Sequence, residues 1–203
     1  MFKDLSISKR LIIGFGLLIM ILIVTNLMAM KHMAETMDNM DLLVNERVLK
    51  IKEANNINER TLSIGRSLRG ILIADSREER EAIKAEIHKL RELNGPSLAT
   101  LEKLIHSPEG KALLSKIVAV RDKAGPQYEQ YFNIAERDLN EAKTYIKTEL
   151  TPTMNGFLET THAMVEFQEL LMHQAVEKDR AAYASGRNMN IGILIVATLF
   201  AVG

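Results

Sequence analysis

Residues 37–72 read MDNMDLLVNERVLKIKEANNINERTLSIGRSLRGIL, and this stretch decides the fold. Positions suited to a helix-packing seam recur at alternating steps of three and four, as in a coiled coil. The seam positions are Met37, Met40, Val44, Arg47, Ile51, Ala54, Asn58, Thr61, Gly65, Leu68 and Leu72. The pattern predicts a first long helix that continues to about Ala74.

Two further helix starts follow in the sequence. Asp75 and Ser76 can cap a second helix, whose seam continues until a point near His106. The sequence SPEG at Ser107–Gly110 then places Ser at an N-cap and Pro at the first helical position, which predicts a third helix ending near Glu136.

A last helix is expected after Arg137 and Asp138 and can run unbroken into Met189. Four amphipathic helices joined by short connections predict an all-α fold, an antiparallel up-down four-helix bundle. Gly95-Pro96 and Gly125-Pro126 lie inside the second and third helices. Since an interior Pro removes a hydrogen bond, each should kink or split its helix.

Residues 11–30, LIIGFGLLIMILIVTNLMAM, carry no charge and have about the length that a helix needs to cross a bilayer. The run exceeds the hydrophobic region of a cleaved signal peptide and no A-x-A-like site follows, which favours an uncleaved anchor. Lys3, Lys9 and Arg10 precede it, so the N-terminus should be cytoplasmic.

The apolar residues from Met189 onward are expected to start a second, truncated transmembrane helix. The expected domains are a cytoplasmic N-terminus at 1–10, a transmembrane helix at 11–30, a periplasmic four-helix bundle at 31–188 and the start of the second span at 189–203.

The composition excludes several classes of function. The 203 residues include 26 basic and 26 acidic side chains, so the balanced charge gives no nucleic-acid footprint. The sequence has no Cys, which removes disulfides, CxxC zinc sites and Cys nucleophiles. The Glu159–His162 motif ETTH lacks the twin that a di-iron bundle requires, and no phosphate loop or nucleophile elbow is present. We therefore expect no catalytic residues, no metal and no cofactor.

Several short motifs lie in order between the two apolar segments: Asn45-Glu46-Arg47, Ser107–Gly110, Glu149-Leu150-Thr151-Pro152 and Phe167-Gln168. Their order and spacing resemble the methyl-accepting chemotaxis proteins, bacterial chemoreceptors with a four-helix-bundle ligand-binding domain. The resemblance implies an inner-membrane homodimer whose periplasmic domain binds a small attractant near the membrane-distal end. It also implies a cytoplasmic part that controls a chemotaxis kinase together with an adaptor protein.

The candidate ligand-binding residues are Arg66, Arg69, Arg121, Tyr128 and Thr61. Arg66 and Arg69 lie three residues apart on one helix face, and guanidinium forks match carboxylates. The alternative is a solvated helix surface. Arg121 lies beside a seam, where it either pairs with a neighbouring acid or awaits an anionic ligand. Tyr128 and Thr61 would supply neutral hydrogen bonds.

The leading hypothesis is a chemoreceptor sensory module that binds a small organic acid, either a di- or tricarboxylate or an amino acid. An alternative is the input domain of a sensor histidine kinase or cyclase, because the same bundle can precede a catalytic output domain. A third possibility is a structural coiled coil without a ligand.

Overall fold

The computed structural model describes residues 7–202, and all its regular elements are helices. The chain forms two compact units. The bundle unit is Val44–Leu171, and the second unit joins the described parts of Met1–Leu43 and Met172–Gly203. The periplasmic boundaries at residues 31 and 188 stay a prediction.

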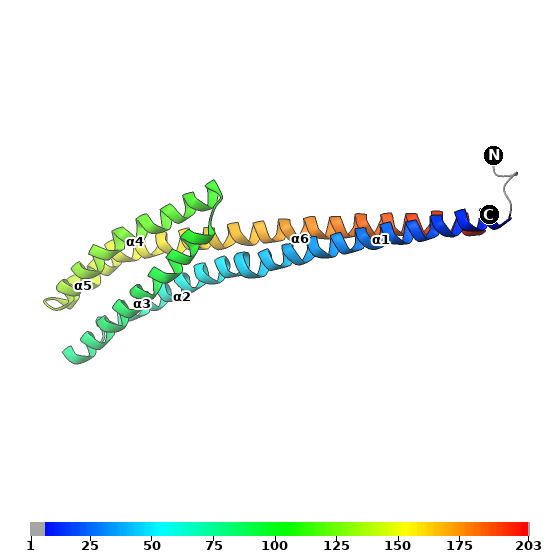
Figure 1. The fold of residues 1–203 in the computed structure, drawn as a ribbon. Helices are drawn as coiled ribbons and strands as arrows, with labels where there is room; N and C mark the ends of the chain where they lie inside the picture. The colour runs from blue at the N-terminus through cyan, green and yellow to red at the C-terminus, as the bar shows by residue number, and fades with distance from the viewer. Residues whose placement is uncertain (1–6, 203) are drawn as a thin grey trace. The chain divides into compact units, whose positions relative to one another are not determined.

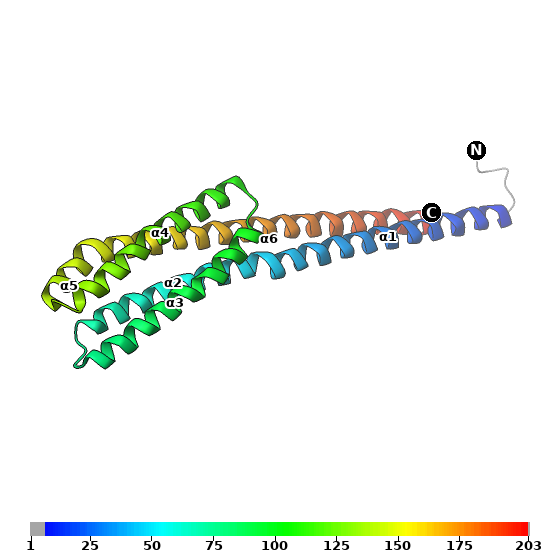
Figure 2. The ribbon, with the colours of Figure 1, turned by 60° about the vertical axis from the view of Figure 1, so that its left-hand side comes forward.

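The bundle unit is an up-down arrangement of antiparallel helices (Figures 1 and 2). α2 packs against α3, and α4 packs against α5 and the segment that follows it. The turns α2–α3 and α4–α5 lie at one end of the bundle, and the α3–α4 connection lies at the other. The helices are α2 (Leu49–Ile71), α3 (Arg77–Leu104), α4 (Pro108–Ala135), α5 (Leu139–Tyr145) and the first part of α6 (Thr151–Val202).

Local capping explains where these helices begin. The Ser76 hydroxyl accepts a hydrogen bond from the Glu79 amide at 3.0 Å, and the Ser107 hydroxyl accepts one from the Gly110 amide at 3.2 Å. The Asp138 carboxylate accepts from the backbone amides of the first turn of α5. Each cap satisfies an amide that has no partner within its helix. The predicted starts of the second and third helices are therefore confirmed.

The bundle core consists of two clusters of buried side chains, and both clusters draw on α2, α3, α4 and the first part of α6. The first contains Ile64, Leu68, Ile71, Ile87, Ala124, Tyr128, Tyr131, Phe132, Ile134, Ala135, Ala142, Ile146, Leu150 and Met154. The second contains Ala54, Ile57, Leu98, Leu101, Ile105, Leu114, Ile117, Phe157, Met164 and Val165.

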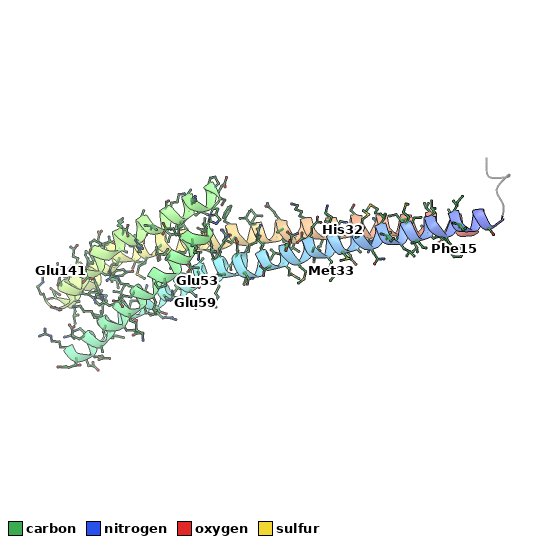
Figure 3. The ribbon with its side chains drawn as sticks, in the orientation of Figure 1. Phe15, His32, Met33, Glu53, Glu59 and Glu141 are labelled. Atoms are coloured by element: carbon green, nitrogen blue, oxygen red, sulfur yellow. The ribbon has the colours of Figure 1, made fainter. Side chains whose placement is uncertain are left out.

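Polar seam positions are also buried and bonded between helices. The Thr161 hydroxyl on α6 donates to the Asn58 side chain on α2. Ser97 on α3 donates to Glu53 on α2 at 2.6 Å, and Glu53 is labelled in Figure 3. Such bonds are lost if one helix slides along another, so they fix the register of the bundle.

Two segments differ from the predicted continuous helices. π-helical turns occupy Leu43–Val48, before α2, and Ile146–Leu150, between α5 and α6. The last helical run continues without a break from Leu139 to Val202, as predicted, but its bonding changes at the π-helical turn between α5 and α6. The first helical region ends at Ile71, slightly before the predicted Ala74. The two Gly-Pro steps, expected to kink or split their helices, do not split them, because α3 and α4 run through Pro96 and Pro126. A kink at each step stays a prediction.

The second unit pairs α1 (Ile7–Leu42) with the C-terminal part of α6, side by side in both views (Figures 1 and 2). Asn39 Nδ2 donates to Asp179 Oδ1 at 2.7 Å between the two helices. Large apolar side chains of α1 face outward, for example Phe15 at 60% and Met33 at 71% exposure (Figure 3).

Within the described residues, one helical stretch, Ile12–Ile71, has the length and the apolar composition needed to cross a membrane. Its apolar part is the predicted first span. Residues 189–202 are helical as part of α6. The second membrane span stays a prediction.

Candidate functional site

A cavity of about 530 Å³, here named the Tyr128 cavity, lies where the two core clusters of the bundle unit meet. All four long helices of the bundle contribute to it. The lining residues are Thr61 and Ile64 of α2; His88, Arg91, Glu92 and Asn94 of α3; Arg121, Asp122, Ala124, Gly125, Tyr128 and Glu129 of α4; and Met154 and Phe157 of α6.

Both arginines of the Tyr128 cavity are paired with carboxylates. Arg91 Nη1 lies 2.9 Å from Glu129 Oε1, and the Arg91 guanidinium stacks 4.8 Å from the centre of the Tyr128 ring. Arg121 contacts Asp122 Oδ1 through Nε at 2.9 Å and Nη2 at 2.8 Å. The lining therefore offers guanidinium donors and carboxylate acceptors side by side, which suits a ligand that carries both kinds of group.

The neutral groups of the cavity are more deeply placed. Tyr128 is 6% exposed, and burial raises the pKa of its hydroxyl to about 12, partly offset by the positive charge of Arg91. Thr61 is 1% exposed and its hydroxyl donates to the Ile57 carbonyl at 2.8 Å. The floor of the cavity thus carries uncharged groups beneath the charged rim.

The two Gly-Pro steps flank this cavity, because Asn94 precedes one step and Gly125 belongs to the other. A Pro nitrogen has no proton to donate to the carbonyl four residues earlier. For Pro96 and Pro126 those carbonyls belong to Glu92 and Asp122, which both line the cavity. The prolines therefore leave two backbone acceptors beside the charged side chains.

Residues 4–183 match a family described as a four helix bundle sensory module for signal transduction. The match covers most of the chain. The chain belongs to this family. Such modules are typical of methyl-accepting chemotaxis proteins, in agreement with the resemblance seen in the sequence. The sequence has no significant match among curated proteins.

The sensory module brings three of the five predicted site residues together. Thr61, Arg121 and Tyr128 line the Tyr128 cavity, although they come from two different helices. Arg121, which the sequence expects either to pair with an acid or to await an anionic ligand, contacts Asp122 in this structure.

Arg66 and Arg69 do not line the Tyr128 cavity. Both are exposed on α2 of the sensory module. Arg66 Nη2 donates to Ser63 Oγ at 2.9 Å, and Arg69 Nη1 donates to the Gly65 carbonyl at 3.1 Å, so both bonds stay within one helix. The structure places them as surface residues, the alternative weighed for them in the sequence.

Sequence reasoning missed the contribution of α3 to the site. Arg91 and Asn94 face the cavity from this helix, together with His88 and Glu92. A signal was present, because Asn94 is a polar seam position directly before Gly95-Pro96. Among the described residues of the sensory module, no group of three or more His, Asp or Glu side chains is arranged to hold a metal ion.

Proposed function

We propose that the sensory module is the ligand-binding part of a chemoreceptor and that it recognises a small organic acid in the Tyr128 cavity. The observation that carries the proposal is the pair of guanidinium groups, Arg91 and Arg121, at a cavity between the two core clusters. A cavity of about 530 Å³ falls within the about 300 to 1,000 Å³ of ordinary small-molecule sites.

The charges of the lining favour an amino acid over a di- or tricarboxylate. Two arginines face three carboxylates, those of Glu92, Asp122 and Glu129, which leaves an excess of one negative charge when His88 is neutral. The carboxylate of an amino acid can replace Asp122 as the partner of Arg121, while its ammonium group is attracted by the remaining carboxylates. A di- or tricarboxylate would meet net repulsion.

The route of the signal begins at α6. Met154 and Phe157 line the Tyr128 cavity, and their helix continues to Val202. A ligand that repacks these two side chains would bias the position of α6, and helix shifts at packed interfaces are typically about 1 to 2 Å. We infer that such a shift, in a homodimer held in the bacterial inner membrane with its bundle in the periplasm, is the output of the module.

A sensor histidine kinase or a cyclase would use the same input and a different cytoplasmic part. Glu- and Gln-rich heptads after residue 203 would support a chemoreceptor with its kinase and adaptor, and an H-box followed by an ATPase domain would support the alternative. A coiled coil without a ligand would not need a cavity lined by paired charges.

The proposal is tested by calorimetric titration of the full chain in lipid nanodiscs with single amino acids and with succinate and citrate. Arg121→Ala should weaken binding of the recognised amino acid by about 2 kcal/mol or more, because its carboxylate loses a charged donor. Arg66→Ala, on the exposed face of α2, is the matched control and should leave affinity unchanged.

Melting temperatures measured on the same samples separate binding from folding. An amino acid at about 100 times its dissociation constant should stabilise the chain by about 2.7 kcal/mol. Affinity that survives Arg121→Ala but disappears with Arg66→Ala would move the site to the exposed face of α2 and refute the proposal.

A further inference from the structure

A second cavity, here named the Phe132 cavity, lies at the end of the bundle that carries the α2–α3 and α4–α5 turns. Its volume is about 230 Å³. It is lined by Ile71 of α2, by Arg77, Arg80, Glu81 and Lys84 of α3, by Phe132 and Ala135 of α4, and by Glu136 and Arg137 directly after α4. None of these residues lines the Tyr128 cavity.

The two cavities have opposite charge. The lining of the Phe132 cavity holds four cationic side chains and two carboxylates, an excess of two positive charges. The Tyr128 cavity holds two arginines and three carboxylates, an excess of one negative charge. A dianion in this module is therefore attracted to the Phe132 cavity and repelled by the Tyr128 cavity.

Among the residues that the structure describes, three of the four cations of the Phe132 cavity form no ion pair with the protein. Arg80 Nη1 donates to the Ala74 carbonyl at 3.3 Å, and Arg137 Nε donates to the Asn133 carbonyl at 3.1 Å. These bonds orient the guanidinium groups without cancelling their charge. Arg77 has no ion-pair partner among the residues that the structure describes. Within the lining, Lys84 Nζ forms an ion pair with Glu136 Oε1 at 3.5 Å.

The floor of the Phe132 cavity is apolar. Ile71 is 2%, Phe132 3% and Ala135 6% exposed, and the Lys84 ammonium lies 5.4 Å from the centre of the Phe132 ring. An apolar floor beneath a cationic rim fits an anion whose charged ends are joined by a hydrocarbon segment. Pockets for drug-sized ligands have volumes of about 300 Å³ or more, and this cavity is smaller. Its occupant must therefore be a short molecule.

We propose that the Phe132 cavity is a second binding site, for a short dicarboxylate. Its two carboxylates bind the guanidinium groups of Arg77, Arg80 and Arg137, and its hydrocarbon segment lies on Phe132. The site does not depend on the ligand proposed for the Tyr128 cavity, and the two use separate residues.

The test is calorimetric titration of the full chain in zwitterionic nanodiscs with succinate, with propionate and inorganic phosphate as comparison probes. Succinate should bind at least about tenfold more tightly than propionate, which has one carboxylate, or phosphate, which has no hydrocarbon. The double variant R77Q/R137Q should weaken succinate binding at least about tenfold. E81Q removes a negative charge from the lining of the cavity. This variant should therefore bind succinate about threefold more tightly than the wild type.

Lys89→Gln is the matched control, since Lys89 is an exposed cation of α3 outside both cavities, and it should leave succinate affinity unchanged. The gain expected from E81Q cannot arise from misfolding. Absence of succinate binding, equal binding of either comparison probe, or an unchanged affinity in E81Q would overturn the proposal. So would a loss of succinate binding in R121Q that R77Q/R137Q does not produce, because it would move the dicarboxylate to the Tyr128 cavity.

Discussion

At the scale of single residues, Tyr128 links the stability of the bundle to pH. Burial raises its pKa in the folded chain to about 12, whereas an exposed tyrosine ionises near 10. Below pH 10 the hydroxyl is neutral in both states and its contribution is complete. Between pH 10 and 12 the unfolded chain releases this proton first, so the free energy of unfolding falls as pH rises.

We therefore expect wild-type protein to lose roughly 2 kcal/mol more stability than Tyr128→Phe between pH 9 and 12. Denaturant unfolding followed by circular dichroism at a series of pH values measures the difference. Tyr183→Phe is the control, because Tyr183 is 73% exposed, and its curve should follow the wild type. Parallel curves for wild type and Tyr128→Phe would show that the hydroxyl is not effectively buried in solution.

At the scale of elements, two glycines test how closely the helices pack. A Cβ at Gly110 would lie 2.6 Å from Ile105 Cγ2 and 2.9 Å from Ser107 Oγ, in the connection between α3 and α4. Ile105 is 2% exposed and branched at Cβ, so it cannot turn away. A Cβ at Gly65 would meet Met154 Cε at 2.9 Å, the far end of a flexible side chain.

Gly110→Ala should accordingly destabilise the protein by about 1 to 3 kcal/mol, because overpacking outweighs the gain in helix propensity. Gly65→Ala should stay within about 1 kcal/mol of wild type, since Met154 can move and Ala favours the helix. Chemical denaturation of both variants gives the comparison. Equal stability of the two would mean that the α3–α4 connection yields as easily as the Met154 side chain.

At the scale of the whole molecule, the basic residues before the first apolar segment predict the topology of the chain. A reporter fused after Lys3 should be cytoplasmic, and one fused near Asp75 should be periplasmic. The reason is that basic residues next to a span, here Lys9 and Arg10, favour the cytoplasmic side of the membrane. Alkaline phosphatase, which is active outside the cytoplasm, provides the measurement. Activity at Lys3 and none at Asp75 would reverse the orientation and place the sensory bundle in the cytoplasm.

The sequence by itself determined the helical class, the first apolar segment and the places where helices begin. These features are local: Ser76 and Ser107 lie within three residues of the amides that they cap. The seam spacing similarly depends only on the helical period. The π-helical turns were not predicted. A change of the backbone hydrogen bonds from i→i+4 to i→i+5 does not alter which amino acids the segment contains, so the composition gives no sign of it.

Only the tertiary structure decided which polar residues share a cavity. Thr61, Arg91 and Tyr128 come from three helices, and the rotation of each helix decides which of its charged residues meets the others. Arg66 and Arg69 share one face of α2, as their spacing predicts, but that face is exposed. Helical period fixes which residues share a face, whereas packing against the neighbouring helices fixes what the face meets, and the latter depends on residues far away in the chain.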